Sequence, residues 1–404
     1  MFGQLSLKRY AFKPKTRDEK YDGSENIYPL DVSANLPINS YSYIIQEMVT
    51  LASNNQSYKQ ASKFIDKIFN IRLCVDTIER ITKDSSIAFS GFFDSLKPEV
   101  AKNEEIVVVS TDGKGVPMTK EESKKIKGRT GRGEKKQKKK ESLVSVCYAT
   151  MPIARTATQV ASSLILGSTD KDMEQFKTED ILKFASIAKT KQECYLDLKN
   201  YSKKISNGKK LVVLLDGARN LWSLTESTFG DTDYVGILDI IHVRDYLYSS
   251  AHALYGEGSR EVPQWVFKRC EMILSGDTKN LILELENISE KLSKSKLKTV
   301  QKTITYFKNH LQQMKYDEYL KEGYPIASGV VESACSQIVA NRTELPGARW
   351  SIDGAEAILK HRSVFASDLW DEYWYYNKVF KQDRNYSNCI DVVNNVLDEF
   401  ELCG

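Results

Sequence analysis

The sequence predicts an α/β fold that is interrupted by a long all-helical segment. Short runs of β-branched and aliphatic residues alternate with stretches in which apolar residues recur every three or four positions. One stretch of roughly 80 residues shows the helical spacing alone. The chain has 404 residues, of which 41% are hydrophobic and 28% charged. It is therefore long enough for about two to three domains with a sizeable core.

The N-terminal quarter divides into an irregular arm and a pair of short helices. Residues 1–56 show no sustained periodicity, and we interpret them as a loosely structured arm. Apolar residues then recur at helical spacing at Ala61, Phe64, Ile65 and Ile68. Asn70 interrupts this pattern, and Val75–Asp84 predicts a second helix. Two short helices joined by a turn indicate a helix-turn-helix DNA-binding region over residues 57–100, although two helices that merely pack together give the same pattern.

Four apolar runs predict strands, and the segments between them supply the helices of an α/β fold. The four runs are Glu105–Thr111, Ser142–Thr150, Leu211–Leu215 and Gly236–Ile241. The first two are expected to form a hairpin with a very long connection. A further short strand is expected near Thr158–Leu166, and a helix over residues 170–204.

The remainder of the chain is predicted to be helical. Residues 244–324 contain no strand pattern, and Tyr324-Pro325 ends this block. A helix over Val330–Asn341 follows, and another begins near Ala355. The tail carries an aromatic cluster that we interpret as a packing surface, with a base-stacking platform as the alternative. Its members are Trp370, Tyr373, Trp374, Tyr375 and Tyr376.

Several classes of protein are excluded by what the sequence lacks. No apolar run approaches the ~18 residues that a membrane-spanning helix needs, and the N-terminus lacks the apolar stretch of a secretory signal. A cytoplasmic protein without a membrane partner is expected. The seven cysteines are scattered without a C-x-x-C, so zinc is not expected. No P-loop and no G-x-S-x-G motif occurs, and no small-molecule cofactor is expected.

The positive charge of the chain is concentrated in one segment. Between Lys120 and Lys140 there are eleven basic and three acidic residues, a local net charge of +8 against +4 for the whole chain. Such a run is often only a solvated surface, but Lys and Arg side chains also supply phosphate contacts to DNA without reading its sequence. The candidate DNA contacts are Lys127, Arg129, Arg132, Lys135, Lys136, Lys138, Lys139 and Lys140.

Two of the predicted strands end in Asp-Gly, at Asp112 and Asp216. A carboxylate at the end of a strand lies at the edge of an α/β sheet where ligands bind, although a plain turn has the same sequence. Carboxylate oxygens are the ligands that Mg²⁺ prefers. Glu332, in the first turn of the helix after Ser328-Gly329, is the leading candidate for a third acid. Three such acids can hold a metal pair for phosphodiester displacement.

Six motifs of this chain, taken in order, resemble the ISKra group of bacterial insertion-sequence transposases, which is similar to Mutator-like transposases. They are DGKGVPM from Asp112, LDGARNLW from Leu215, LDIIHVRDYL from Leu238, YPIASGVVESAC from Tyr324, GARWS from Gly347 and DGAEA from Asp353. The likeness extends from about residue 27 to residue 376.

The resemblance implies a ribonuclease-H-like mixed sheet with flanking helices, interrupted by an all-helical insertion and preceded by a helix-turn-helix. The catalytic domain would comprise residues 101–245 and 326–404, with the insertion at 246–325. Asp112, Asp216 and Glu332 would be the metal-binding catalytic residues, with Mg²⁺ or Mn²⁺. His242 would assist catalysis through the D-x-x-H element that begins at Asp239. Lys114, Arg219 and Arg349 would be further DNA contacts.

The implied activity is DNA transposition. The enzyme would bind the element ends, cleave DNA strands and join the freed 3′-OH ends to target DNA, as a homodimer or higher assembly on DNA. One alternative is a structure-specific nuclease of the same fold, and another is a domesticated DNA-binding protein without catalysis. Relatives of this type carry paired N-terminal cysteines, whereas residues 1–40 contain none. The arm over residues 1–56 would then be a degenerate or truncated zinc-ribbon region.

Overall fold

The computed structural model describes residues 6–14, 26–102, 105–126, 139–167, 175–206, 208–395 and 400–402. The chain forms two compact units. The first comprises residues 1–96, 116–140 and 338–404, and the second comprises residues 97–115 and 141–337. The division therefore differs from the predicted one, because residues 338–404 belong with the N-terminal helices. The reason is packing: helix α17 (Ile352–Ala366) contacts α2 (Tyr43–Asn55) and α4 (Val75–Ser85).

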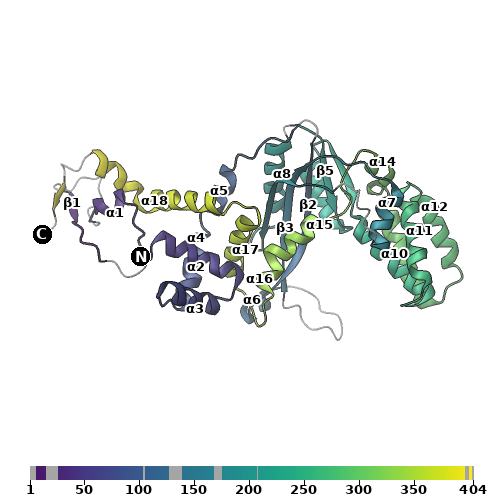
Figure 1. Ribbon diagram of the computed structural model, residues 1–404, viewed down its shortest axis with the longest axis horizontal. Helices are drawn as coiled ribbons and strands as arrows, with labels where there is room; N and C mark the ends of the chain where they lie inside the picture. Colours follow the sequence, from purple (N-terminus) through teal and green to yellow (C-terminus); the bar gives the residue numbers. More distant parts are fainter. Residues whose placement is uncertain are drawn as a thin grey trace. The chain divides into compact units, whose positions relative to one another are not determined.

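A mixed five-stranded sheet is the centre of the second unit, so the predicted α/β class is confirmed (Figure 1). The strand order is β4-β3-β2-β5-β6. Strand β2 pairs with β5 in parallel, β5 pairs with β6 in parallel, and β3 pairs with β4 antiparallel. The strands are β2 (Ile106–Pro117), β3 (Lys139–Thr150), β4 (Glu179–Ser186), β5 (Leu211–Leu215) and β6 (Tyr234–Leu238).

The four apolar runs all form strands, but two of the predicted ends are wrong. Strand β2 does not stop before Asp112 and continues to Pro117. Its second half is held by β3, where the Ser142 hydroxyl donates to the carbonyl oxygen of Lys114 at 2.8 Å. Strand β6 ends at Leu238, because Asp239 caps a helix that begins at Ile240.

Two predictions between β3 and β5 are wrong. The expected strand at Thr158–Leu166 is helix α7 (Ala157–Ala161) followed by a π-helix, η1 (Ser162–Leu166). A capping box, in which Thr156 and Gln159 satisfy each other's backbone amides, starts this helix. The expected helix over residues 170–204 divides into strand β4 and helix α8 (Lys191–Ser206). Strand β4 forms because it completes the edge of the sheet beside β3.

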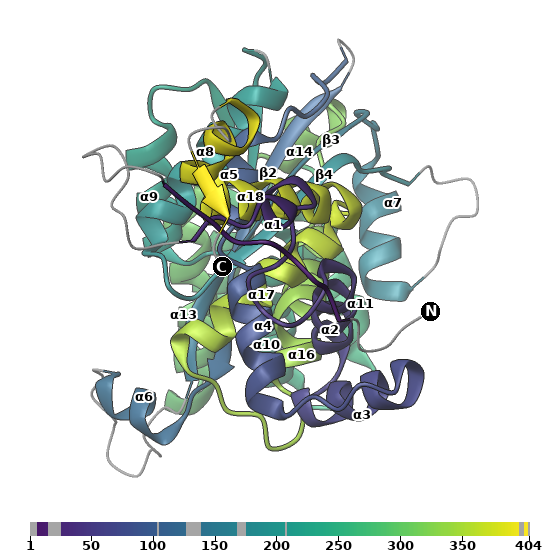
Figure 2. The ribbon, with the colours of Figure 1, turned by 90° about the vertical axis from the view of Figure 1, so that its left-hand side faces the viewer.

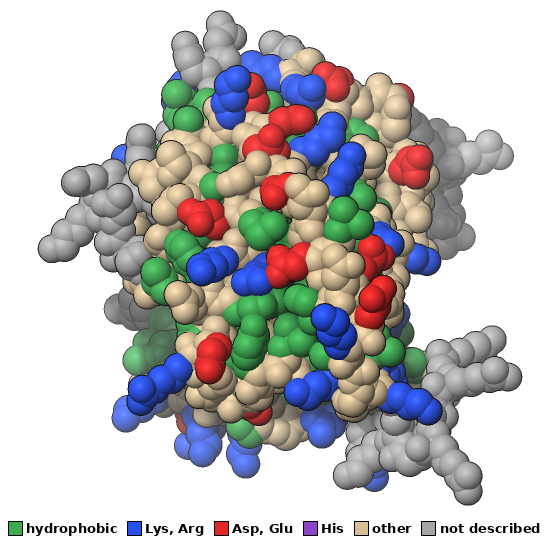
Figure 3. All heavy atoms as spheres, turned by 90° about the vertical axis from the view of Figure 1, so that its right-hand side faces the viewer, with side chains coloured by type: hydrophobic (Ala, Val, Ile, Leu, Met, Phe, Trp, Pro, Cys, Tyr) green, Lys and Arg blue, Asp and Glu red, His purple; other side chains and the backbone are tan. Residues whose placement is uncertain are grey.

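Residues 244–324 contain helices and no strand, as predicted. The segments are α10 (Ile240–Tyr255), α11 (Glu261–Leu274), α12 (Thr278–Ser289), α13 (Lys294–Asn309), the 3₁₀-helix η2 (Leu311–Gln313) and α14 (Tyr316–Lys321). Leu247, Ala251, Cys270 and Phe307 are fully buried within this block. Figure 3 looks onto the side of the molecule on which these helices lie in Figure 1, and basic side chains gather along the lower edge of that face.

The first unit contains a three-helix cluster, α2, α3 (Tyr58–Phe69) and α4 (Figure 2). The two helices predicted from residue 57 onward are confirmed, and Asn70 ends α3 with a left-handed backbone. Ala61 and Ile65 are fully buried, whereas Phe64 and Ile68 are exposed, so only half of the predicted apolar face is core. Helix α2 lies within the arm predicted to be loose, because its Val49 and Ile45 complete the cluster.

The remaining elements of the first unit are short, apart from the C-terminal helices. They are β1 (Phe12–Pro14), α1 (Pro29–Ser33), α5 (Phe89–Ser95), α6 (Lys120–Lys125), α16 (Asn341–Thr343), α18 (Trp370–Asn395) and β7 (Phe400–Leu402). Tyr373 and Trp374 are buried against Phe92, so the packing interpretation of the aromatic tail holds for these two side chains. Among the described residues, no helix has both the length and the apolarity to cross a membrane.

Candidate active site

Asp112 lies on β2, and Asp216 directly follows the neighbouring strand β5. Strands β2 and β5 are paired from Val107 and Leu211 up to Ser110 and Leu214. Asp112 lies two residues beyond Ser110 within β2, and Asp216 directly follows β5. Because the strands are parallel, both side chains belong to the same end of the β2–β5 pair.

The Asp112 carboxylate is half-buried and held by two donors. The backbone amide of Gly113 donates to Oδ1 at 2.6 Å, and the Cys335 thiol donates to Oδ2 at 3.4 Å. Burial raises the pKa of Asp112, and the charge of Asp216 raises it further, while the two donors oppose the shift. Burial and the charge of Asp112 also raise the pKa of the Cys335 thiol, which is therefore a neutral donor.

The loop after β5 is fixed around Asp216. Its Oδ1 accepts a hydrogen bond from the amide of Ala218 at 2.9 Å, and its carbonyl accepts one from the Trp222 indole at 2.7 Å. Gly217 allows a close approach, because a Cβ at that position would lie 2.1 Å from the ring of Tyr306. The second oxygen of the Asp216 carboxylate takes no part in these contacts. The loop thus presents a half-exposed acid on a rigid backbone.

Asp239 is fully buried and forms hydrogen bonds with residues at the start of two helices. Its Oδ1 accepts from the backbone amides of Ile241 and Ser328, at 3.1 and 3.0 Å. Its Oδ2 accepts from the Ser328 hydroxyl at 2.7 Å and lies 2.8 Å from Nδ1 of His242. These four contacts use the approximately four acceptor positions of a carboxylate. Asp239 therefore joins α10 to the start of α15 (Gly329–Ala334).

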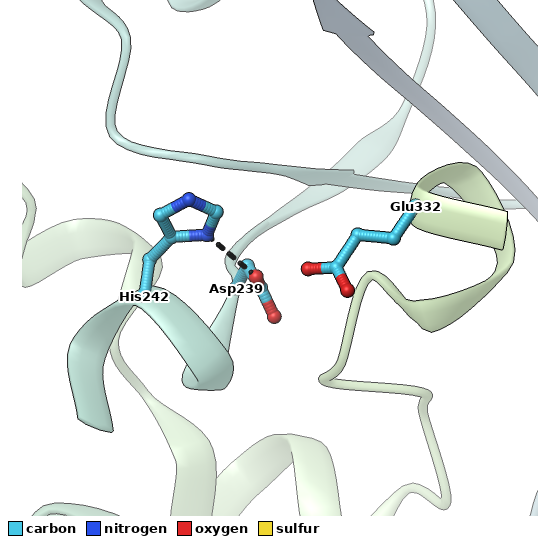
Figure 4. Close-up of side chains that lie close together, drawn as sticks. All are labelled: Asp239, His242 and Glu332. Atoms are coloured by element: carbon cyan, nitrogen blue, oxygen red, sulfur yellow. Dashed lines mark hydrogen bonds and ion pairs between the residues drawn. The ribbon is translucent and has the colours of Figure 1, made fainter. Parts of the chain in front are cut away.

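His242 lies on the first turn of α10, half-buried beside Asp239 (Figure 4). The hydrogen bond to Asp239 raises the pKa of His242 to about 9, and the charges of Asp239 and Asp216 act in the same direction against burial. The raised pKa favours the protonated imidazolium at neutral pH, and Asp216 is among the charges that raise it.

Glu332 projects from α15 toward Asp239 (Figure 4). It is exposed, and its Oε1 lies 3.1 Å from the Ser328 hydroxyl. That hydroxyl has one proton, and its shorter contact is with Asp239. Glu332 therefore holds its position weakly. The helix continues as a π-helix, η3 (Cys335–Ala340), in place of the regular helix predicted to Asn341.

One set of potential metal ligands is already gathered. Within the described residues, the one group of three or more His, Cys, Asp or Glu side chains whose ligating atoms all lie within 4.8 Å of one another is Asp239, His242 and Glu332. This group could bind a metal ion. Asp112 and Asp216 are not members of it, so the structure gathers Glu332 with Asp239 and His242 more tightly than with the two predicted partners.

The candidate metal ligands differ in whether hydrogen bonds within the protein already occupy their lone pairs. Asp239 is saturated, and Nδ1 of His242 is occupied by Asp239. Asp112, Asp216 and Glu332 each retain carboxylate oxygen that no strong donor occupies. An all-oxygen set of this kind suits Mg²⁺ or Mn²⁺, whereas a set that includes imidazole suits softer metals. The three acids therefore have the ligand chemistry that a hard divalent cation requires, but they do not form a group whose oxygens all lie within 4.8 Å of one another.

The predicted DNA contacts are distributed over both units. Lys127, Arg129, Arg132, Lys135, Lys136 and Lys138 lie outside the described residues. Lys139 forms an ion pair with Glu344 at 2.5 Å, and Lys140 is half-buried in β3. Lys114 is half-buried in β2, whereas Arg219 and Arg349 are exposed.

Sequence reasoning missed three partners of the acids. Ser328 bonds to Asp239 across 89 positions of the chain, and Cys335 bonds to Asp112 across 223. Tyr306 packs on Gly217 from the helical block. The one available signal was the proximity of Ser328 and Cys335 to Glu332 in the sequence.

Comparison with known proteins adds no assignment to this site. No protein-family model matches the sequence, and a search of curated proteins finds no match.

Proposed function

We propose that this protein is a DDE transposase, in which Asp112, Asp216 and Glu332 hold the divalent cations for DNA strand cleavage and joining. The observation that carries the proposal is the pair of half-buried aspartates on adjacent parallel strands, close enough for one charge to raise the pKa of the other. Burying two like charges side by side is unfavourable unless a cation or a proton compensates them.

The sheet supports the ribonuclease-H-like part of the proposal. It is mixed and five-stranded, its central strand β2 carries Asp112, and a helical block separates the strand of Asp216 from Glu332. The motifs that resemble ISKra-group transposases include all three acids. The proposal also assigns DNA reading to α3 and α4 and implies a dimer or larger assembly, because two element ends must be joined together.

Each group has a role in this proposal. Mg²⁺ or Mn²⁺, when bound, would activate the attacking oxygen and stabilise the charge on the leaving 3′ oxygen. Asp112 and Asp216 would supply ligands from β2 and from the end of β5, and Glu332 would supply one from the first turn of α15. Asp239 fixes the start of that helix through Ser328. His242, as an imidazolium, places a positive charge beside the site for the scissile phosphate.

The test is a strand-cleavage and strand-joining assay on the DNA that flanks the gene, with Mg²⁺. Asp112→Asn, Asp216→Asn and Glu332→Gln should each fold and lose several orders of magnitude of cleavage rate. Asp233→Asn and Glu318→Gln are matched controls on exposed acids of the same unit and should cleave as the parent does. Cleavage without joining would identify a nuclease. Undiminished cleavage by any one of the three variants would remove that residue from the site.

A further inference from the structure

A cationic groove lies beside the candidate active site, within the second unit. It has a volume of about 800 Å³ and is lined from the loop after β5, from the start of α9 (Arg219–Phe229), from α10, and from α13 and the residue that follows it. Its basic side chains are Arg219, Lys294, Lys298 and Lys302, and no Asp or Glu is among the described residues that line it. Gly217, the neighbour of Asp216, forms part of the wall. The groove therefore begins at the backbone that carries one of the proposed metal ligands.

The four cations of this groove are not neutralised by the protein. In the part of the chain that the structure describes, none of them forms an ion pair. Other lysines near the same helix behave differently. Lys308 pairs with Glu286 at 2.5 Å, and Lys296 donates to the carbonyl of Leu254 at 3.2 Å. The positive charge that faces the groove is thus available to a ligand.

The spacing of these lysines is unfavourable for the helix itself. Lys294, Lys298 and Lys302 are four residues apart, so they form one stripe along α13, and like charges at this spacing destabilise a helix. The first turn of α13 has no acidic residue to offset its own partial positive charge. A bound polyanion would offset both the repulsion among the three lysines and the partial positive charge at the start of α13.

Aromatic side chains form the apolar wall of the groove. Tyr246 and Tyr306 are stacked, with ring centroids 3.9 Å apart and an interplanar angle of 16°. Beside this pair, Nδ1 of His310 lies 2.8 Å from the carbonyl oxygen of Tyr306. Phosphate-binding cations beside an aromatic wall are the combination that binds single-stranded nucleic acid, because bases can stack on rings only when they are unpaired.

We propose that this groove binds a single DNA strand that continues from the active site. Lys294, Lys298, Lys302 and Arg219 would contact successive phosphates, and Tyr246 would contact an unpaired base. The inference rests on the proposed function for its choice of DNA, but it concerns binding and not catalysis. It assigns to the helical block the task of holding an unpaired strand beside Asp216.

The experiment measures the binding of a labelled dT15 strand and of a labelled 20-base-pair duplex by fluorescence anisotropy, in EDTA, between 50 and 200 mM KCl. The variant is Lys294→Gln with Lys298→Gln and Lys302→Gln. The matched control is Lys268→Gln with Lys279→Gln and Lys291→Gln, which makes the same charge change on exposed positions of the helical block outside the groove. Thermal unfolding verifies that both fold.

The groove variant should lower the salt slope for the single strand by roughly 2, about 0.7 for each lost phosphate contact. The control should leave that slope unchanged. Tyr246→Leu, which keeps an apolar side chain against Tyr306, should weaken single-strand binding roughly 5- to 150-fold and duplex binding much less.

Equal effects of the two triple variants, or none from either, would overturn the groove assignment. A Tyr246→Leu variant that weakens duplex and single strand alike would overturn the assignment of an unpaired base. Because no metal is present, loss of strand binding in the groove variant supports the groove even if the parent protein cleaves nothing. If the parent protein cleaves DNA and the groove variant still binds the single strand as the parent does, the groove assignment is wrong and the proposed function stands.

Discussion

Asp112 and Asp216 each lie two residues beyond Ser110 and Leu214, the last registered pair of the parallel β2–β5 ladder. Their separation along the chain exceeds one hundred residues, and the sheet brings them to one end of two adjacent strands. Asp216 raises the pKa of Asp112, which indicates that the two charges interact. In the proposed function, a shared cation would compensate these two charges.

Asp239 should be a positioning residue whose loss costs stability. In Asp239→Asn, an amide NH₂ would face buried donors such as the amide and hydroxyl of Ser328. Leaving buried donors unsatisfied costs about 1–3 kcal/mol for each group. Urea unfolding of Asp239→Asn should therefore show a loss of a few kcal/mol. His242→Ala removes one of the four donors to Asp239, so it should destabilise the protein less than Asp239→Asn does and should cleave DNA more slowly. Equal stability losses in the two variants would contradict this positioning role.

Gly217 should tolerate no side chain while Tyr306 is present. An added Cβ would lie 2.1 Å from the Tyr306 ring, so Gly217→Ala should destabilise the protein by about 1–3 kcal/mol. Adding Tyr306→Ala should relieve the clash, and the double variant should be less destabilised than the sum of the two single changes. Gly329→Ala is the control, because a Cβ there meets no atom within 4 Å. Additive effects measured by urea unfolding would contradict the steric explanation.

The segment at residues 127–138 should contribute to DNA affinity without sequence preference. It contains six Lys/Arg and one Glu. If about five of its cations contact phosphates, its deletion should lower the slope of log K against log[salt] for duplex DNA by roughly 4–5. The comparison needs at least two unrelated duplexes. A loss confined to one of them would indicate base reading, and an unchanged slope would identify a solvated connection.

The first unit should lose stability in mild acid because of His361. This side chain is fully buried and its Nε2 donates to the carbonyl of Thr82 at 3.0 Å. Burial lowers the pKa of His361 to about 4, against about 6.5 in the unfolded chain. The unfolded state therefore binds the proton first as the pH falls, and stability is lost between about pH 6.5 and pH 4.

Between pH 7 and pH 5, this difference amounts to about 2 kcal/mol of unfolding free energy. Tryptophan fluorescence during urea unfolding provides the measurement, since Trp370 lies beside the His361 ring. His361→Gln should reduce the dependence on pH, whereas His252→Gln, at an exposed position, should not. An unchanged pH dependence in His361→Gln would contradict the assignment.

Local patterns predicted the parts of this fold that local forces determine. Strand β5 is an unbroken run of five buried aliphatic residues, and α3 combines helical spacing with a capping box. Strand β4 was missed because it lies at the edge of the sheet and carries Lys183 among its apolar residues, so its sequence resembles an amphipathic helix. Asp239 and His242 belong to the D-x-x-H element, but the contact between Ser328 and Asp239 could not be predicted, because it forms only through tertiary packing.

Binding of Mn²⁺ in the absence of DNA, followed by electron paramagnetic resonance, shows directly which side chains hold the metal. Asp112→Asn, Asp216→Asn and Glu332→Gln should each weaken Mn²⁺ binding strongly, while His242→Ala and the control Asp233→Asn should bind Mn²⁺ as the parent protein does. Binding that is lost in His242→Ala and intact in Asp112→Asn and Asp216→Asn would place the metal with Asp239, His242 and Glu332 and would refute the assignment to the two strand-end aspartates.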